Sequence, residues 1–180
     1  MSDLKTSFYG LEPEIILEAI ESLKLRPTGE MRQLNSYENR VFEILLEDGE
    51  RKVIKFYRPG RLSADTLREE HSFLWELRES EVPVVAPDKF AGETLHQHAG
   101  LLYTVFPKAY GRMPDEILRN ETQSVGRLLA QLHMVGAEKE FRHRPMLGFS
   151  PYTPENVLYE LKRHVSVELW PRYEDAALEL

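Results

Sequence analysis

The first regular pattern is a run of apolar residues at helical spacing between Pro13 and Leu25. Apolar positions that recur every three or four residues form one face of an amphipathic helix. Pro13 falls near the first turn, where proline is tolerated. We therefore predict a helix over 13–25, with an apolar set made of Ile15, Ile16, Leu17, Ala19, Ile20, Leu23 and Leu25.

The pattern then changes to that of short strands. Arg32–Asn35 and Arg40–Leu46 are predicted strands, separated by the polar loop Ser36–Asn39. The pair Asp48–Gly49 is a strong hairpin-turn signal within a charged segment. The strand that follows, Val53–Tyr57, is stopped by a proline–glycine pair. Together these segments indicate an antiparallel sheet.

A second helix is expected to begin at Ser63, a suitable N-cap, and to end before Pro83. Two further strands are predicted at Phe90–Glu93 and Leu101–Phe106, around a turn near Ala99–Gly100. The positions of the second helix that recur at helical spacing are Leu67, His71, Leu74 and Leu77.

The remaining chain has mostly helical patterns. A short helix is expected at 115–119, and 122–135 is the longest amphipathic stretch. Residues 155–163 and 167–180 are also predicted to be helical, the latter interrupted near Pro171. The order of helix, strands, helix, strands and helices defines an α+β fold.

Composition narrows the class of protein. The 180 residues are 42% hydrophobic and 29% charged, which is typical of an ordinary globular domain or of two small lobes. The net charge of −7 argues against a general nucleic-acid coat. The absence of cysteine excludes disulfides, thiolate metal sites and a cysteine nucleophile. No apolar run resembles a signal sequence or a membrane span, so we expect a cytoplasmic protein without a membrane partner.

Lys55 is the most informative single residue. It lies within Val53–Tyr57, whose other members suit a packed strand. Lysine is among the side chains least often buried, because an unpaired buried ammonium is costly. A lysine at this place indicates a neighbouring anion, either a helix carboxylate or a phosphate. A kinase-type nucleotide site supplies both.

The order of elements around Lys55 is that of a kinase small lobe, and the sequence resembles a known family there. The segments 34–41 and 53–59 resemble bacterial stress response kinase A, in the aminoglycoside phosphotransferase and choline kinase branch of protein-kinase-like enzymes. The resemblance runs from about Leu11 to the mid-150s. Further matching motifs are Glu69-Glu70-His71, Glu81-Val82-Pro83-Val84, Val105-Phe106-Pro107, Gly126-Arg127 with Leu132-His133, and His143-Arg144-Pro145.

This resemblance implies a protein-kinase-like small lobe, an antiparallel sheet with a helix of the αC type, followed by the first helices of a truncated large lobe. We expect residues 1–107 to form the N-terminal helix and small lobe. Residues 108–180 would form the connector and a partial helical large lobe. ATP is the implied cofactor, with Mg²⁺ in the full-length family.

The resemblance also implies which residues meet ATP. Lys55 would contact the α- and β-phosphates, steadied by a helix carboxylate. By the family's spacing this partner is Glu70, with the adjacent Glu69 as the alternative about 100 degrees round the helix. Ser36 would touch the phosphates from a loop that contains no glycine. Without the family match, this loop is a polar hairpin tip.

Adenine is expected between the lobes, against the strand that ends at Phe106. Backbone groups around Phe106 and Lys108 would pair with the purine edge, because Pro107 has no N–H. Val105 or Phe106 would form the apolar wall. Without an upstream Lys55 and Glu70, the same residues describe a strand that runs into a proline turn.

Parts of the family's catalytic machinery are absent from the sequence. The chain has no His-Gly-Asp loop, no Asp-Phe-Gly and no Asp-x-Asp, so it carries no catalytic-loop aspartate and no Mg²⁺ ligands of the family type. We expect the chain to be an N-terminal portion that is inactive by itself. Apolar positions on 122–135 would then be exposed and favour self-association.

Three functional hypotheses remain. The first is a stress-response kinase that phosphorylates protein serine and threonine, and the second is a phosphotransferase for an aminoglycoside or choline-like alcohol. The third is a non-catalytic nucleotide-binding or interaction fragment. Two histidines without an acidic cluster, His96 and His98, are interpreted as solvated rather than metal-binding.

Overall fold

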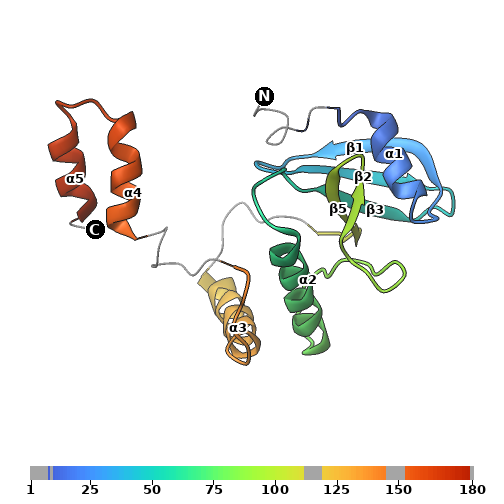
Figure 1. Ribbon diagram of the computed structural model, residues 1–180. Coiled ribbons are helices and arrows are strands. Elements are labelled where there is room, and N and C mark those ends of the chain that lie inside the picture. The colour runs from blue at the N-terminus through green and yellow to red at the C-terminus, as the bar shows by residue number, and fades with distance from the viewer. Residues whose placement is uncertain (1–7, 9, 112–118, 145–152, 179–180) are drawn as a thin grey trace. The chain divides into compact units, whose positions relative to one another are not determined.

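The computed structural model describes residues 8, 10–111, 119–144 and 153–178. The chain divides into two compact units, Met1–Arg142 and His143–Leu180, and each is described by itself. The first unit contains a five-stranded sheet and three helices in its described part, and the second contains two helices and a 3₁₀ turn (Figure 1). The prediction of an α+β fold is confirmed. The predicted boundary at 107/108 stays a prediction.

The sheet is antiparallel with the order β1-β2-β3-β5-β4. Its regular pairing explains why the strand predictions at 40–46 and 101–106 match so closely, since alternating apolar residues and turn signals fix both ends. Gly49, with φ of 85°, makes the predicted turn between β2 and β3. The strand bounds are β1 Pro27–Leu34, β2 Arg40–Leu46, β3 Arg51–Phe56, β4 His96–His98 and β5 Leu101–Pro107.

Helix α1, Pro13–Glu21, covers one face of the sheet. Its buried residues Ile16, Ala19 and Ile20 share a core with side chains such as Ile54 and Phe56 of β3. The helix is shorter than the predicted 13–25. Leu23 and Lys24 donate to carbonyls three residues back, and Lys24 adopts a φ of 64°, so the chain leaves the helix and turns toward β1.

Helix α2, Ala64–Glu79, lies on the other face of the sheet (Figure 1). The Ser63 hydroxyl accepts a hydrogen bond from the N–H of Thr66 at 3.1 Å, which confirms the predicted N-cap. Leu67 of α2 packs with Tyr57 and Leu95 in a second apolar cluster. The two clusters sit on opposite faces because successive strand residues alternate between them.

The predicted strand at Phe90–Glu93 is wrong. Phe90 and Glu93 form only an isolated bridge, because Ala91 and Gly92 both have positive φ and make a tight turn. The strand that pairs with β5 is instead β4, and the predicted turn at Ala99–Gly100 joins the two. Two turns, at Ala91–Gly92 and at Ala99–Gly100, follow each other in this segment. Local β propensity does not tell which of the residues around them form the strand.

Helix α3, Arg119–Gly136, includes the predicted stretch 122–135. The short helix predicted at 115–119 lies almost wholly outside the described residues. The second unit contains α4 Pro154–Leu161, a 3₁₀ turn at Lys162–His164 and α5 Trp170–Leu178. Pro171 lies in the first turn of α5, where proline is tolerated. The prediction that it interrupts a helix is therefore wrong.

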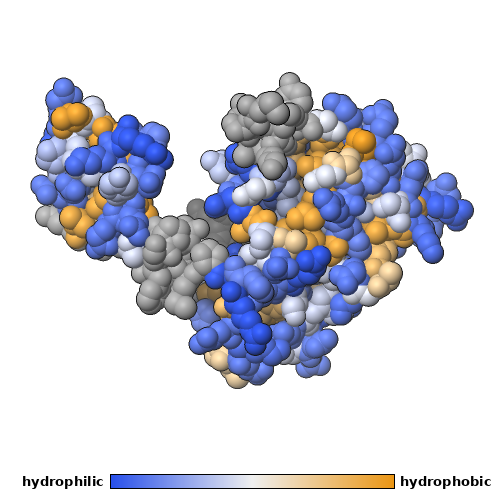
Figure 2. All heavy atoms as spheres, viewed as in Figure 1, coloured by the Kyte–Doolittle hydropathy of each residue, from blue (hydrophilic) through white to orange (hydrophobic). Residues whose placement is uncertain are grey.

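Figure 2 shows hydrophilic residues interspersed with hydrophobic ones on the viewed face of the first unit. In the part of the chain that the structure describes, every helix is too short or too polar to cross a membrane.

Candidate nucleotide site

Lys55 lies on the face of β3 that is turned toward α2. Its cross-strand neighbours are Val41 in β2 and Thr104 in β5, and cross-strand neighbours share a face of the sheet. The side chain is half-buried, and its Nζ lies 4.7 Å from the centre of the Tyr57 ring. The ammonium is thus kept close to the sheet rather than extended into open solvent.

The two candidate carboxylates of α2 face different surroundings. Glu69 Oε1 accepts a hydrogen bond from the backbone N–H of Arg142 at 2.6 Å, beyond the end of α3. Burial raises the pKa of the Tyr57 hydroxyl, and the negative charge of Glu70 acts in the same direction. The charge of Lys55 likewise acts on the adjacent His71. Lys55 and Glu70 thus each act electrostatically on one member of the hydrogen-bonded pair Tyr57 and His71.

This pair is part of a buried hydrogen-bonded chain that the sequence did not reveal. His71, 1% exposed, lies between the Tyr57 hydroxyl, 2.7 Å from Nε2, and Thr94 Oγ1, 2.9 Å from Nδ1. The Thr94 carbonyl accepts a hydrogen bond from the hydroxyl of Thr104 at 2.7 Å. The chain thereby connects β3, α2, the segment before β4, and β5.

Burial, together with the nearby charges of Lys55 and His96, lowers the pKa of His71 to about 4. The imidazole is neutral near pH 7 and offers one donor and one acceptor. Those two roles match its two neighbours in either tautomer. The one sequence signal was a histidine at an apolar position of the helix.

A second polar cluster surrounds Glu43 on the same face of the sheet. Glu43 is 5% exposed and accepts hydrogen bonds from Lys108, from Arg32 at 3.0 Å and from Arg51 at 3.1 Å. The hydrogen bond from Lys108, supported by Arg32, lowers the pKa of Glu43 to about 2 although burial acts in the opposite direction. Sequence reasoning missed this cluster, because its members come from four separate segments.

The predicted adenine-binding segment has one face toward each helix. Phe106 is half-buried and lies opposite Val53 on the Lys55 face. Val105 is fully buried in the core beneath α1, so the prediction that it walls the adenine ring is wrong. The N–H of Lys108 donates to the Arg51 carbonyl at 3.3 Å, which extends the sheet by one rung.

The predicted phosphate loop connects β1 to β2. Ser36 is exposed there. The loop is fastened at its end, where the Asn39 side-chain oxygen accepts a hydrogen bond from the N–H of Arg58 at 3.2 Å. Glu38 pairs with Arg61 at 3.2 Å. The loop is thus tied to the segment that follows Lys55's strand.

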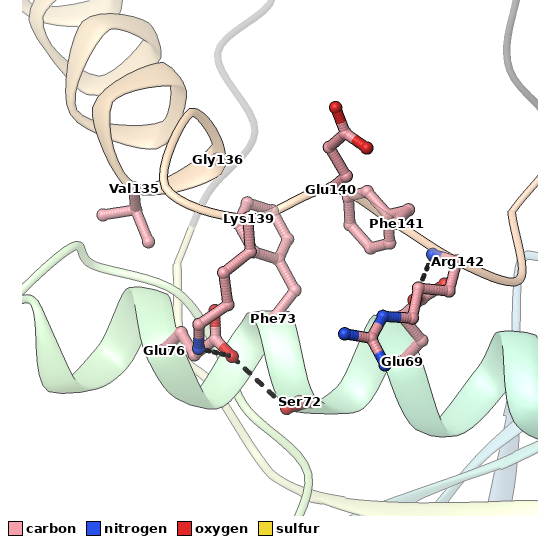
Figure 3. A pocket seen from close by; sticks show the side chains of 10 residues that line it. All are labelled: Glu69, Ser72, Phe73, Glu76, Val135, Gly136, Lys139, Glu140, Phe141 and Arg142. Atoms are coloured by element: carbon pink, nitrogen blue, oxygen red, sulfur yellow. Dashed lines mark hydrogen bonds and ion pairs between the residues drawn. The ribbon is translucent and has the colours of Figure 1, made fainter.

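The outer side of α2 borders a hollow of about 520 Å³ (Figure 3). Phe73 meets Phe141 edge to face at 5.4 Å between ring centres, and Lys139 pairs with Glu76 at 2.8 Å. These contacts attach α2 to the end of α3 and the residues after it. The lining residues are Glu69, Ser72, Phe73, Glu76, Val135, Gly136, Lys139, Glu140, Phe141 and Arg142.

The two histidines of β4 have separate surroundings. His96 lies among the rings of Phe90 and Tyr103, at 5.8 and 5.5 Å, and His98 lies 3.2 Å from Glu18. His96 is therefore partly enclosed by rings, whereas solvation had been expected. Among the described residues, no group of three histidine or acidic side chains is placed to hold a metal ion.

Comparison with known proteins identifies related sequences. A family model described as the phosphotransferase enzyme family matches residues 30–180. Stress response kinase A of Salmonella choleraesuis is 43% identical over 152 residues, covering 84% of this chain and 46% of the relative. A serine/threonine protein kinase named RdoA, of Salmonella typhimurium, is 42% identical with the same coverage. The chain spans about half the length of the curated relatives it matches.

Solved structures show the same fold at low sequence identity. An amicoumacin kinase in complex with AMP-PNP, Ca²⁺ and its ligand matches with a TM-score of 0.65 at 17% identity, over 86% of this chain and 54% of that one. Spectinomycin phosphotransferase with ADP and spectinomycin gives 0.56 at 10% identity, over 85% and 47%. A macrolide 2′-phosphotransferase from Brachybacterium faecium gives 0.52 at 21% identity, over 90% and 58%.

Proposed function

The chain belongs to the phosphotransferase enzyme family, and on that premise we propose that it binds ATP on the Lys55 face of its sheet. In this proposal the chain supplies the nucleotide-binding half of a kinase of the stress response type, which phosphorylates protein serine and threonine. The proposal is supported by relatives above 40% identity that are named as stress response kinase A and as a serine/threonine protein kinase.

The position of Lys55 carries the proposal. A half-buried ammonium on the α2 face of the sheet is suited to a polyphosphate. The ammonium lies over the ring of Tyr57, and the charge of Glu70 helps to raise the pKa of the same tyrosine. Glu69 is less suited as its partner, because it accepts a hydrogen bond from Arg142 on the outer side of α2. We therefore assign Lys55 to the α- and β-phosphates and Glu70 to the support of Lys55.

The base is assigned by register. The cross-strand pair Val53 and Phe106 lies two residues along the strands from the pair Lys55 and Thr104, on the same face of the sheet. An apolar ring would pack against it. The carbonyl rather than the N–H of Lys108 would meet the purine, since its N–H donates to Arg51. Ser36, exposed in its loop, would donate to the phosphates. ATP fits these residues in charge and in apolar surface.

A metal-dependent step is not part of the proposal. Mg²⁺ requires several oxygen ligands, and the described residues contain no cluster of three acidic or histidine side chains. The chain's own residues would bind and orient the nucleotide. A protein substrate is proposed from the name of a relative, a serine/threonine protein kinase. The cytoplasm is proposed as the place of reaction, as expected from the sequence.

Lys55→Met is expected to raise the Kd for ATP by roughly 10- to 100-fold, because it removes a charge-assisted hydrogen bond to a phosphate. The measurement is isothermal titration calorimetry with ATP. Lys89→Met, which removes an exposed lysine stacked over Trp75 on the outer surface, is the matched control and should leave the Kd unchanged. Equal ATP affinity in the parent chain and in Lys55→Met would remove Lys55 from the site.

The acceptor is tested separately. A protein that contains this sequence and has the full length of the relatives is incubated with radiolabelled ATP. The acceptor is either a denatured protein mixture or spectinomycin. Label on protein serine or threonine supports the proposed class. Label on the small molecule alone favours the second hypothesis, a small-molecule phosphotransferase.

A further inference from the structure

We propose that Tyr57 and His71 are positioning residues, which fix the rotation of α2 so that Glu70 rather than Glu69 is turned toward Lys55. The part of this inference that concerns ATP rests on the proposed function. The part that concerns the helix rests on the contacts of the described residues alone.

The tyrosine contacts Lys55, one partner of the proposed ion pair, and His71, the neighbour of the other partner in the sequence. The face of its ring lies 4.7 Å from Nζ of Lys55, and its hydroxyl lies 2.7 Å from Nε2 of His71, the residue next to Glu70. Tyr57 is 6% exposed, so both contacts are shielded from water. A buried hydrogen bond and a cation–π contact are each stronger when water is excluded.

In a helix, the direction of the His71 side chain fixes the directions in which the neighbouring side chains point. Successive residues are rotated by about 100° around a helix axis. When His71 points into the sheet, Glu70 points about 100° to one side and Glu69 about 200° away. The structure agrees, because Glu69 accepts its hydrogen bond from Arg142 on the outer side, where it lines the hollow of Figure 3.

Rotation of α2 would break more than one bond. His71 is also held at Nδ1 by Thr94, whose carbonyl accepts from Thr104, the cross-strand neighbour of Lys55. Turning the helix would leave buried polar groups without partners, which is unfavourable. The hydrogen-bonded chain therefore links the register of β3 and β5 to the rotation of α2.

A matched pair of variants separates positioning from general stability. Tyr57→Phe keeps the ring beneath Lys55 and removes only the hydroxyl that meets His71. Tyr103→Phe removes a comparable buried hydroxyl, one that donates to the Ala19 carbonyl at 2.8 Å on the opposite face of the sheet. Both variants are expected to lower the unfolding midpoint in urea by similar amounts.

The two variants should differ in ATP binding. Tyr57→Phe is expected to raise the Kd for ATP about 3- to 10-fold and to leave the Kd for adenosine unchanged, because the phosphates alone depend on Lys55. Tyr103→Phe should change neither. In a double-mutant cycle, Tyr57→Phe added to Glu70→Gln should have little further effect. Equal effects of both tyrosine variants on ATP, or full additivity with Glu70→Gln, would overturn the proposal.

A nucleotide-free measurement keeps this inference distinct from the proposed function. Amide hydrogen exchange should accelerate in α2 for Tyr57→Phe and in α1 for Tyr103→Phe. Unchanged exchange in α2 overturns the positioning role. If the parent chain fails to bind ATP while α2 responds as expected, the proposed function fails and the positioning of α2 by Tyr57 and His71 stands.

Discussion

At the scale of single residues, the first unit keeps several ionisable side chains where water is scarce. Glu43 remains charged because three cations surround it, whereas His71 remains neutral because burial and the charge of Lys55 oppose its protonation. The two groups lie on the same face of the sheet, and each takes the protonation state that its own surroundings favour.

We predict that His71 makes stability depend on acid. Its pKa is about 4 in the folded protein and near 6.5 when unfolded, so the unfolded chain binds more protons between these values. The contribution is present above pH 6.5, is lost as the pH falls toward 4, and amounts to about 3 kcal/mol. An NMR titration should show the His71 imidazole neutral at pH 5. A midpoint near 6.5 would contradict the prediction.

At the scale of elements, α2 determines the geometry of the candidate site because it is held at three places. Its N-terminus is capped by Ser63, its inner face is bonded through His71, and its outer face meets Phe141 and Lys139 through Phe73 and Glu76. Lys139 is largely exposed, so its ion pair with Glu76 contributes little, and the cap and the buried contacts dominate.

Ser63→Ala is expected to destabilise the protein by about 1 kcal/mol, because the N–H of Thr66 loses its acceptor. Urea unfolding gives the free energy, and hydrogen exchange should locate the loss in the first turn of α2. Ser80→Ala is the control, since at that end of α2 the backbone N–H of the C-cap makes the bonds. Equal losses in the two variants would argue against the cap.

At the scale of the whole molecule, the two units differ in how much apolar surface they bury. The first unit has a core on each face of its sheet, whereas the second has Leu158 and Trp170 as its buried apolar residues among those described. The C-terminal end of helix α3 contacts α2. Three apolar side chains of α3 nevertheless remain exposed: Leu128 by 43%, Leu129 by 51% and Met134 by 72%. Such a surface favours association with another apolar surface.

We predict that the chain self-associates through α3 at high concentration. Leu129→Glu should lower the apparent mass in sedimentation velocity experiments, because it places a charge within the apolar surface. Gln123→Glu, an exposed polar position of the same helix, should behave as the parent does. A parent chain that stays monomeric throughout would refute this prediction.

Features that depend on neighbouring residues could be predicted from the amino-acid sequence alone. The alternation around Lys55, the turn at Gly49 and the cap at Ser63 were all predicted, because each arises from local backbone and side-chain preferences. The family was predicted from motifs within short segments. Where two local preferences competed, as between Phe90 and His98, the strand was misplaced.

Contacts between residues that are distant in the sequence became visible in the folded protein. The sequence left Glu69 and Glu70 as alternatives, and the rotation of α2 against the sheet gave them different surroundings. The chain from Tyr57 through His71 to Thr94, and the cations around Glu43, likewise join separate segments. Burial and charge act through space, so the chemistry of a side chain depends on what the fold packs against it.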